Sequence, residues 1–197
     1  MADSDWFNEL IRTSYHRVVL AVLPATGQLT AARQTATAAF VEGWLLRGLL
    51  IEDPHREKWL IRTALAATAR DSATARESAA GESACGRAAI LPGDSAARRL
   101  LAALTHPPAR PVEAVILHEV LGFSIARVAE LRGITAEQVR ARLGGGWIQL
   151  AMDLGGDVRV ELGIAGLRDE LHRRVALPTS DEMVRAVQVG AAHRGVA

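Results

Sequence analysis

Hydrophobic residues recur at three- and four-residue steps along most of the chain, which is the spacing of an amphipathic α-helix. The first run covers residues 6–23, with the apolar positions Phe7, Leu10, Ile11, Val18 and Val22. We expect Ser4 or Asp5 to cap its start, and Pro24 and Gly27 to end it. No stretch alternates apolar and polar residues for long enough to predict a β-strand. The pattern therefore predicts an all-α protein.

Two more helices are expected before a change in character. One begins at Thr30 and the next near Arg56, after the turn signal at Asp53 and Pro54. Their apolar residues are Phe40, Val41, Trp44 and Leu45 in the second helix, and Trp59, Leu60 and Leu65 in the third. Between residues 72 and 94 small and polar residues dominate, and few side chains could anchor a core. This segment is therefore predicted to be a flexible linker, partly helical at its start.

Helical spacing returns after this segment. Prolines 107, 108 and 111 are expected to break the chain between the first two of the new helices. These helices are predicted over residues 97–104, 112–121, 125–132 and 136–143. The whole pattern gives a first helical domain (1–72), a linker (73–95), a second helical domain (96–154) and a C-terminal helical extension (155–197).

The C-terminal extension repeats the helical spacing. One apolar stripe, which predicts a helix over residues 158–176, consists of Val160, Ile164, Leu167, Leu171 and Val175. Thr179 and Glu182 have the spacing of a capping box that opens a further helix with Met183, Val184 and Val187. We expect the stripe to pack against the same chain, with Trp147 as a candidate receiving residue. Two alternatives stay open: the extension completes the second domain, or it is a regulatory flap.

Composition narrows the class of protein. The 197 residues are 49% hydrophobic and 23% charged, as in soluble globular proteins, and no apolar run approaches the ~20 residues of a membrane span. A single cysteine, Cys85, cannot form an internal disulfide, which favours a cytoplasmic protein. No Cys and His cluster has metal-ligand spacing, and no nucleophile, carboxylate pair or phosphate loop has a convincing context. We therefore expect neither an enzyme nor a cofactor.

Residues 124–143 carry the spacing of a helix-turn-helix. A small residue at Ala129 lets two helices approach, Gly133 supplies a turn with positive φ, and Val139, like Ile134, buries the second helix. Thr135 can cap that second helix and point its N-terminus at a DNA major groove. The candidate DNA-binding residues are Thr135, Glu137, Gln138, Arg140 and Arg142. The alternative is an ordinary helical hairpin within a bundle.

At this point the chain resembles the extracytoplasmic-function sigma factors, the small two-domain initiation factors of bacterial RNA polymerase. The likeness of the second domain rests on LLAALTHPPARPVEAVILHEVLGFSIARVAELRGITAEQVRARL. Residues 139–143 look like the family's Val-Lys-Ser-Arg-Leu recognition segment. In the first domain the likeness rests on Phe7, Leu10, Tyr15, the Phe40 and Trp44 pair, and Trp59 with the Leu-Ile-Arg that follows. It covers roughly residues 6–72 and 97–154.

The resemblance implies that the first domain binds RNA polymerase core and opens the minus-ten element, while the second reads the minus-thirty-five element of promoter DNA. It also places the polymerase-binding surface around Gln34, Thr37 and Glu42. An anti-sigma factor is a further possible partner that the resemblance suggests.

Several positions depart from the family's pattern. The family's polar Asp-x-x-Gln-Glu run falls on Gln34, Thr37 and Ala38, so most of its acidic residues are missing. The Asn and Asp of the promoter-melting helix fall on Ala66 and Arg70. Where the family continues with arginines after Leu143, this chain has three glycines, which weaken a helix and remove phosphate contacts.

These departures keep three functions open. The first is a sigma-like regulator that binds polymerase core and promoter DNA. The second is a degenerate sigma-like protein that no longer reads promoters and acts through protein contacts, for example with an anti-sigma factor. The third is an ordinary helix-turn-helix repressor that dimerises through the C-terminal extension.

Overall fold

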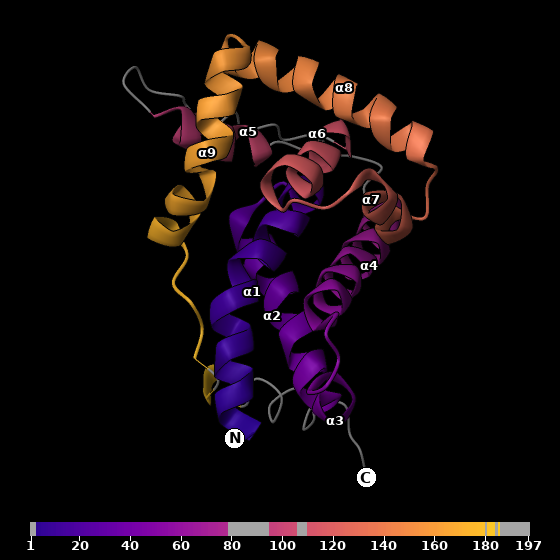
Figure 1. The fold of residues 1–197 in the computed structure, drawn as a ribbon, viewed down its shortest axis with the longest axis vertical. Coiled ribbons are helices and arrows are strands. Elements are labelled where there is room, and N and C mark those ends of the chain that lie inside the picture. Colours follow the sequence, from indigo (N-terminus) through magenta and orange to yellow (C-terminus); the bar gives the residue numbers. More distant parts are fainter. Residues whose placement is uncertain (1–2, 79–94, 106–109, 180, 184, 186–197) are drawn as a thin grey trace.

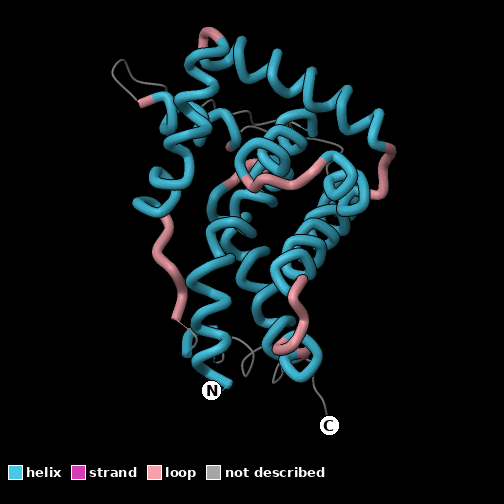
Figure 2. Tube along the Cα trace, viewed as in Figure 1, coloured by secondary structure: helices cyan, strands magenta, loops and turns pink. Residues whose placement is uncertain are grey.

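The computed structural model describes residues 3–78, 95–105, 110–179, 181–183 and 185. Every regular element in these segments is helical, and none of them contains a β-strand (Figure 2). This confirms the prediction of an all-α fold. No helix in the described segments is long and apolar enough to span a lipid bilayer.

The first half of the chain forms a bundle of long helices. Its elements are α1 (Asp3–Thr26), α2 (Leu29–Leu45), the short α3 (Arg47–Leu50) and α4 (Arg56–Ser78). Helix α1 packs against both α2 and α4, and the three run side by side in Figure 1. Aromatic rings fill the interior: Phe7 lies edge-on to Phe40 with ring centroids 6.3 Å apart, and 4.8 Å from Trp44. The predicted starts of the second and third helices lie within a residue of the observed ones, at Leu29 for α2 and Arg56 for α4.

Two expectations about α1 were wrong. Ser4 and Asp5 lie inside its first turn, because the helix begins earlier, at Asp3. Pro24 does not end the helix but lies in its last turn, where it removes only one intrahelical hydrogen bond and its ring is buried. The chain turns at Gly27, which has a φ of 65° and donates its amide to the Leu23 carbonyl.

The second half contains the remaining helices. They are α5 (Ala96–Leu104), α6 (Arg110–Val115), a π-helical turn η1 (Ile116–Val120), α7 (Ile125–Arg132), α8 (Ala136–Leu154) and α9 (Asp157–Arg174). The helix predicted over 112–121 is thus α6 and η1 in succession, and Pro111 lies in the first turn of α6 instead of breaking it. Helix α7 has the predicted bounds.

Helix α8 is much longer than predicted. The expectation that it would stop near Leu143, before the three glycines, was wrong, because the helix continues to Leu154. Its central part packs closely against α6, and Gly146 is buried in that contact. Tertiary packing therefore outweighs the low helix propensity of glycine. In Figure 1 α8 crosses over the end of the α1, α2 and α4 bundle.

Polar contacts join the two halves. Arg17 of α1 donates from Nη2 to the Leu121 carbonyl at 2.9 Å, and its Nε forms an ion pair with Glu57 of α4 at 2.6 Å. Lys58 Nζ lies 2.7 Å from a carboxylate oxygen of Glu130 in α7. Of the predicted linker, residues 73–78 belong to α4, Ser95 caps α5, and residues 79–94 lie outside the described segments.

The C-terminal extension forms α9, as predicted, and four residues of its stripe are fully buried: Val160, Leu167, Leu171 and Val175. The surface that receives α9 is mainly α5, not Trp147. Two glycines of α9 explain why it packs on α5. A Cβ on Gly163 would lie 3.0 Å from the Ala96 carbonyl oxygen, and one on Gly166 would lie 3.0 Å from Ala97 Cβ. Glycine at both positions lets the two helices approach almost backbone to backbone.

Candidate functional site

Helices α7 and α8 form the helix-turn-helix that the sequence predicts. Ser124 caps α7 by accepting a hydrogen bond from the Arg127 amide at 3.2 Å. Gly133 ends α7 in the left-handed conformation, with φ 61°, and the amide of Ile134 donates to the Ala129 carbonyl at 3.1 Å. Val139 of α8 is completely buried. Gly133 and Val139 therefore have the structural roles expected of them.

The start of α8 is fixed by a capping box. The Thr135 hydroxyl accepts a hydrogen bond from the Gln138 amide at 3.1 Å, and the Gln138 side-chain oxygen accepts one from the Thr135 amide at 3.0 Å. Thr135 and Gln138 were both candidate DNA-binding residues. The side-chain oxygens of both residues accept hydrogen bonds within the capping box. The side-chain NH₂ group of Gln138 remains available to donate to a base or phosphate.

The remaining three candidates lie in the first two turns of α8. Glu137 and Arg140 are exposed, and Arg142 is half-buried. Within the described segments neither arginine has an ion-pair partner. Two basic residues of α7 are occupied instead: Arg127 pairs with Glu130 at 2.8 Å and Arg132 pairs with the buried Glu113 at 3.2 Å. Among the described residues, the cations of this module that have no ion-pair partner are therefore Arg140 and Arg142 of α8.

The exposed face of α8 changes character beyond these arginines. Gly144 and Gly145 present no side chain, and the next exposed positions are apolar: Ile148 is 64% exposed and Met152 is 74% exposed. Both line a shallow groove of about 690 Å³ with Trp147, Asp157 and Glu161. The second half of α8 therefore offers no cation to phosphate.

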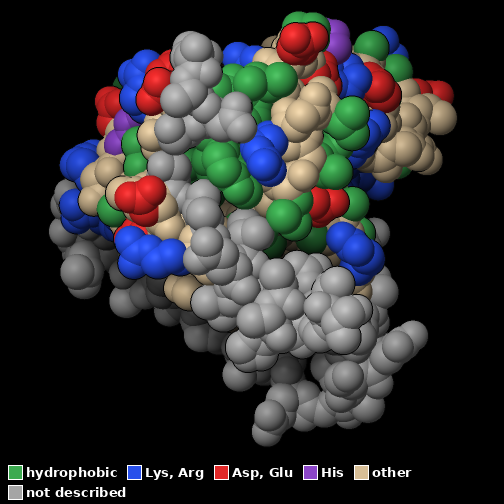
Figure 3. All heavy atoms as spheres, turned by 90° about the horizontal axis from the view of Figure 1, so that it is seen from below, with side chains coloured by type: hydrophobic (Ala, Val, Ile, Leu, Met, Phe, Trp, Pro, Cys, Tyr) green, Lys and Arg blue, Asp and Glu red, His purple; other side chains and the backbone are tan. Residues whose placement is uncertain are grey.

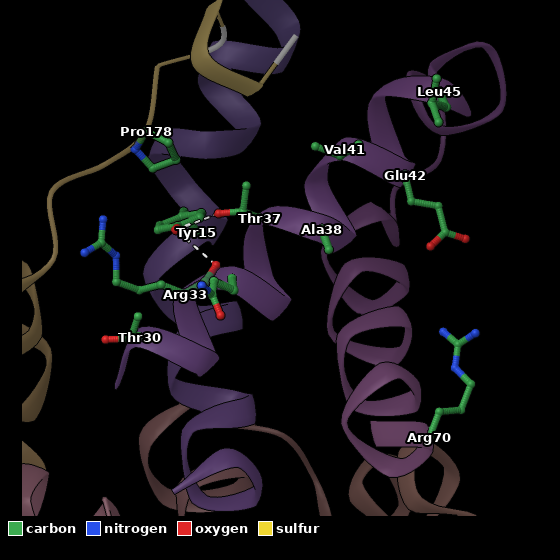
Figure 4. A pocket seen from close by; sticks show the side chains of 11 residues that line it. Tyr15, Thr30, Arg33, Thr37, Ala38, Val41, Glu42, Leu45, Arg70 and Pro178 are labelled. Atoms are coloured by element: carbon green, nitrogen blue, oxygen red, sulfur yellow. Dashed lines mark hydrogen bonds between the residues drawn. The ribbon is translucent and has the colours of Figure 1, made fainter. Parts of the chain in front are cut away.

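The three candidate polymerase-binding residues, Gln34, Thr37 and Glu42, line one groove of about 960 Å³ along α2 (Figure 4). The other lining residues are Tyr15, Thr30, Arg33, Ala38, Val41, Leu45, Arg70 and Pro178. The floor is ordered by Tyr15, whose hydroxyl shares a hydrogen bond of 3.1 Å with Thr37 and donates to the Arg33 carbonyl at 3.5 Å.

One end of this groove continues into an apolar corner between α2 and α3. Leu45 is 51% exposed there, Leu46 38% and Leu49 77%. Seen from below, the described surface at this end of the molecule carries hydrophobic side chains gathered between separate charged ones (Figure 3). Sequence analysis missed this corner, although residues 44–51 hold more large apolar residues than one face of a helix can bury.

The two positions onto which the resemblance places the promoter-melting residues of sigma factors lie on α4. Ala66 is exposed on that helix, and its methyl group can make no hydrogen bond to a base. Arg70 lies one turn further on and lines the α2 groove (Figure 4). The structure thus associates Arg70 with the groove of the candidate polymerase-binding residues, a relationship that the sequence did not reveal.

A buried histidine connects α1 with the end of α9. His16 Nε2 lies 2.8 Å from the Val175 carbonyl oxygen, and its ring centroid is 4.1 Å from that of His172. Burial lowers the pKa of His16 below its usual value of 6.5, and the neighbouring His172 lowers it further, whereas the hydrogen bond to Val175 opposes the change. The environment therefore favours neutral His16.

Within the described segments there is no group of three or more His, Cys, Asp or Glu residues that could hold a metal ion. Comparison of the chain with protein-family models, with curated proteins and with solved structures gave no match.

Proposed function

We propose that this chain is a sigma-factor-like regulator of transcription initiation that binds promoter DNA and RNA polymerase core. The observation that carries the proposal is the start of α8. A left-handed turn at Gly133 is followed by the Thr135 capping box and then by exposed Arg140. A rigid, capped helix that projects a basic residue from its first turns is the device by which helix-turn-helix proteins read a major groove. Such a regulator acts in the cytoplasm of a bacterium.

The α2 groove supports the polymerase half of the proposal. Gln34, Thr37 and Glu42 come together along one side of α2, and the exposed Leu45, Leu46 and Leu49 extend the groove. Polar side chains beside an apolar anchor are typical of protein–protein interfaces. Large exposed apolar residues clustered in this way also mark interaction sites more often than solvent-facing surface.

The direct experiment is a pull-down of the purified full chain with core RNA polymerase from the organism that encodes it, followed by run-off transcription on fragmented genomic DNA. We expect retention of core and transcripts with defined start sites. Glu42→Arg should lower the recovery of core, because it reverses a charge in the groove. Glu52→Arg is the matched control, since Glu52 is exposed and outside the groove. No retention of core by the unaltered chain would contradict the proposal.

A second candidate is a sigma-like protein that acts through protein contacts alone. Exposed Ile148 and Met152 favour it, because they occupy the face of α8 where further phosphate contacts would be needed. In that case the chain would retain core polymerase or an anti-sigma factor in a pull-down yet direct no transcripts. Ile148→Ser with Met152→Ser would then weaken the protein contact, whereas Arg140→Gln would leave it unchanged.

A further inference from the structure

The described chain continues beyond the end of α9 at Arg174. Val175 adopts an extended conformation, with φ −120° and ψ 103°, and residues 175–179, here called the strap, leave the second half of the molecule and run beside α1 (Figure 1). Val175 is only 1% exposed, although it is the first residue after the helix. The strap therefore packs against the first half instead of continuing into solvent.

Both ends of the strap are anchored. At its start the Val175 amide donates to the Leu171 carbonyl at 2.8 Å, and the Val175 carbonyl faces His16 Nε2 at 2.8 Å. At its end the Thr179 hydroxyl accepts from the Glu182 amide at 3.2 Å, while a Glu182 carboxylate oxygen accepts from the Thr179 amide at 2.8 Å. One residue later Met183 is buried to 1% exposure.

Between these anchors Pro178 meets the α2 groove. It lines the same groove as Thr37 and lies above the ring of Tyr15 in Figure 4. Tyr15 and Pro178 line this groove together, so the strap supplies one wall of it beside the Tyr15 ring, which is 1% exposed. The middle of the strap is held less firmly, because Ala176 is exposed and Leu177 is 39% exposed.

We propose that the strap is an intramolecular competitor at the α2 groove: it covers the groove edge at Tyr15, and a protein partner that fills the groove must displace it. The partner is polymerase core, so this part of the inference rests on the proposed function. α9 itself stays in place, since its stripe is buried against α5, and the moving part begins after Val175. The C-terminal extension thus combines a structural helix with a regulatory segment.

The single tyrosine of the chain allows a test that needs no partner. Nitration of Tyr15 by tetranitromethane, followed by mass spectrometry, reports access to the groove floor. Pro178→Gly with Met183→Ser loosens the strap and should nitrate several-fold faster than the native chain. Leu177→Ser, a strap residue whose side chain does not line the groove, should nitrate at the native rate. Because Met183 is buried, Pro178→Gly alone is measured as well, with the helical circular dichroism of each variant as the check of folding. Equal nitration of all chains would overturn the proposal.

The second arm measures binding of purified core RNA polymerase to the same chains. The loosened variants should bind core several-fold more tightly than the native chain, and Leu177→Ser should bind like the native chain. Faster nitration with unchanged core affinity would overturn the competition between strap and partner. Absence of core binding by every chain would overturn the proposed function and this competition together, and it is recognisable because nitration of Tyr15 still separates the variants.

Discussion

Gly146 of α8 lies so close to Pro111 of α6 that a Cβ atom on the glycine would be 2.5 Å from the Pro111 carbonyl oxygen and 2.7 Å from Val115 Cγ2. A Cβ atom is essentially never found this close to another heavy atom, so no side chain fits there without moving α6. Because Gly146 has no side chain, the middle of α8 can pack directly against the backbone of α6. In the sequence, the three glycines 144–146 are expected to weaken the helix. One of them, Gly146, instead allows the close contact that positions α8 on α6.

This close approach predicts opposite effects for two neighbouring glycines. Gly146→Ala gains helix propensity of about 1 kcal/mol but overpacks the contact with α6, which typically costs about 1–3 kcal/mol and here involves a backbone oxygen that cannot turn aside. We expect a net loss of stability. A Cβ on Gly144 meets nothing within 4 Å, so Gly144→Ala should raise the melting temperature by roughly 2–4 °C.

Thermal unfolding followed by circular dichroism distinguishes the two variants. A melting temperature raised by both substitutions would show that α6 and α8 are not in close contact. A melting temperature lowered by both substitutions would show that α8 is not helical at Gly144.

The burial of the α9 stripe predicts a strong dependence of stability on this helix. Leu167 is completely buried, and Leu167→Ala should lower the free energy of unfolding by about 2–5 kcal/mol. Leu162 lies on the same helix but is 61% exposed, so Leu162→Ala should change it by less than about 0.5 kcal/mol. Urea denaturation measures both. Equal effects would mean that α9 does not pack through this stripe.

A buried carboxylate adds a pH dependence to the same helix. Burial alone would raise the pKa of Glu170, but the hydrogen bond from Arg174 and the charges of Arg173, Arg174 and Arg98 of α5 outweigh it and hold the pKa below its usual 4.5. A carboxylate with a lowered pKa stabilises the folded state above pH 4.5, and this contribution is lost as the pH falls through the folded value. Glu170→Gln should therefore make stability less dependent on pH below 4.5, whereas Asp169→Asn, at an exposed neighbour, should leave the native profile.

The sequence predicted the parts of this fold that depend on near neighbours. The end of α7 at Gly133 and the cap of α8 by Thr135 involve residues within a few positions of each other, so their spacing is visible in the chain. The path of α1 through Pro24 and of α8 through Gly146 depends instead on residues that are distant in sequence. No local pattern indicates that packing will outweigh a weak helix former.

The candidate sites divide in the same way. The exposed residues of the helix-turn-helix follow from its spacing, although the structure is needed to show that Gln138 already serves the cap. Gln34, Thr37 and Glu42 were proposed from a family resemblance, and the groove that unites them also needs Tyr15 of α1 and Pro178 of the strap. Pro178 lies 163 positions after Tyr15 in the chain, so helical periodicity could not assign it to the same groove.

The part of α8 that we propose to bind DNA carries few basic residues, and this predicts a shallow salt dependence of that binding. Each phosphate neutralised on duplex DNA contributes roughly 0.9 to the slope of log affinity against log salt concentration. Arg140 and Arg142 would therefore give a slope with a magnitude of about 2. Arg140→Gln with Arg142→Gln should abolish both the binding and the slope. Arg168→Gln, an exposed charge on α9, is the control. Unchanged binding by the double variant would remove the recognition role from α8.

The contact between His16 and Val175 predicts a pH dependence of strap docking. Burial and the nearby His172 lower the pKa of His16 below 6.5, so between the two values the unfolded chain binds more protons at this site than the folded chain does. The contribution of His16 to stability is therefore complete above pH 6.5 and falls as the pH decreases below it. His16→Gln can still donate a hydrogen bond to the Val175 carbonyl but does not titrate. The melting temperature of this variant should change less between pH 7.5 and 5.5 than that of the native chain, while His55→Gln, at an exposed histidine, should follow the native chain. The same profile for all three proteins would show that His16 does not couple protonation to the position of the strap.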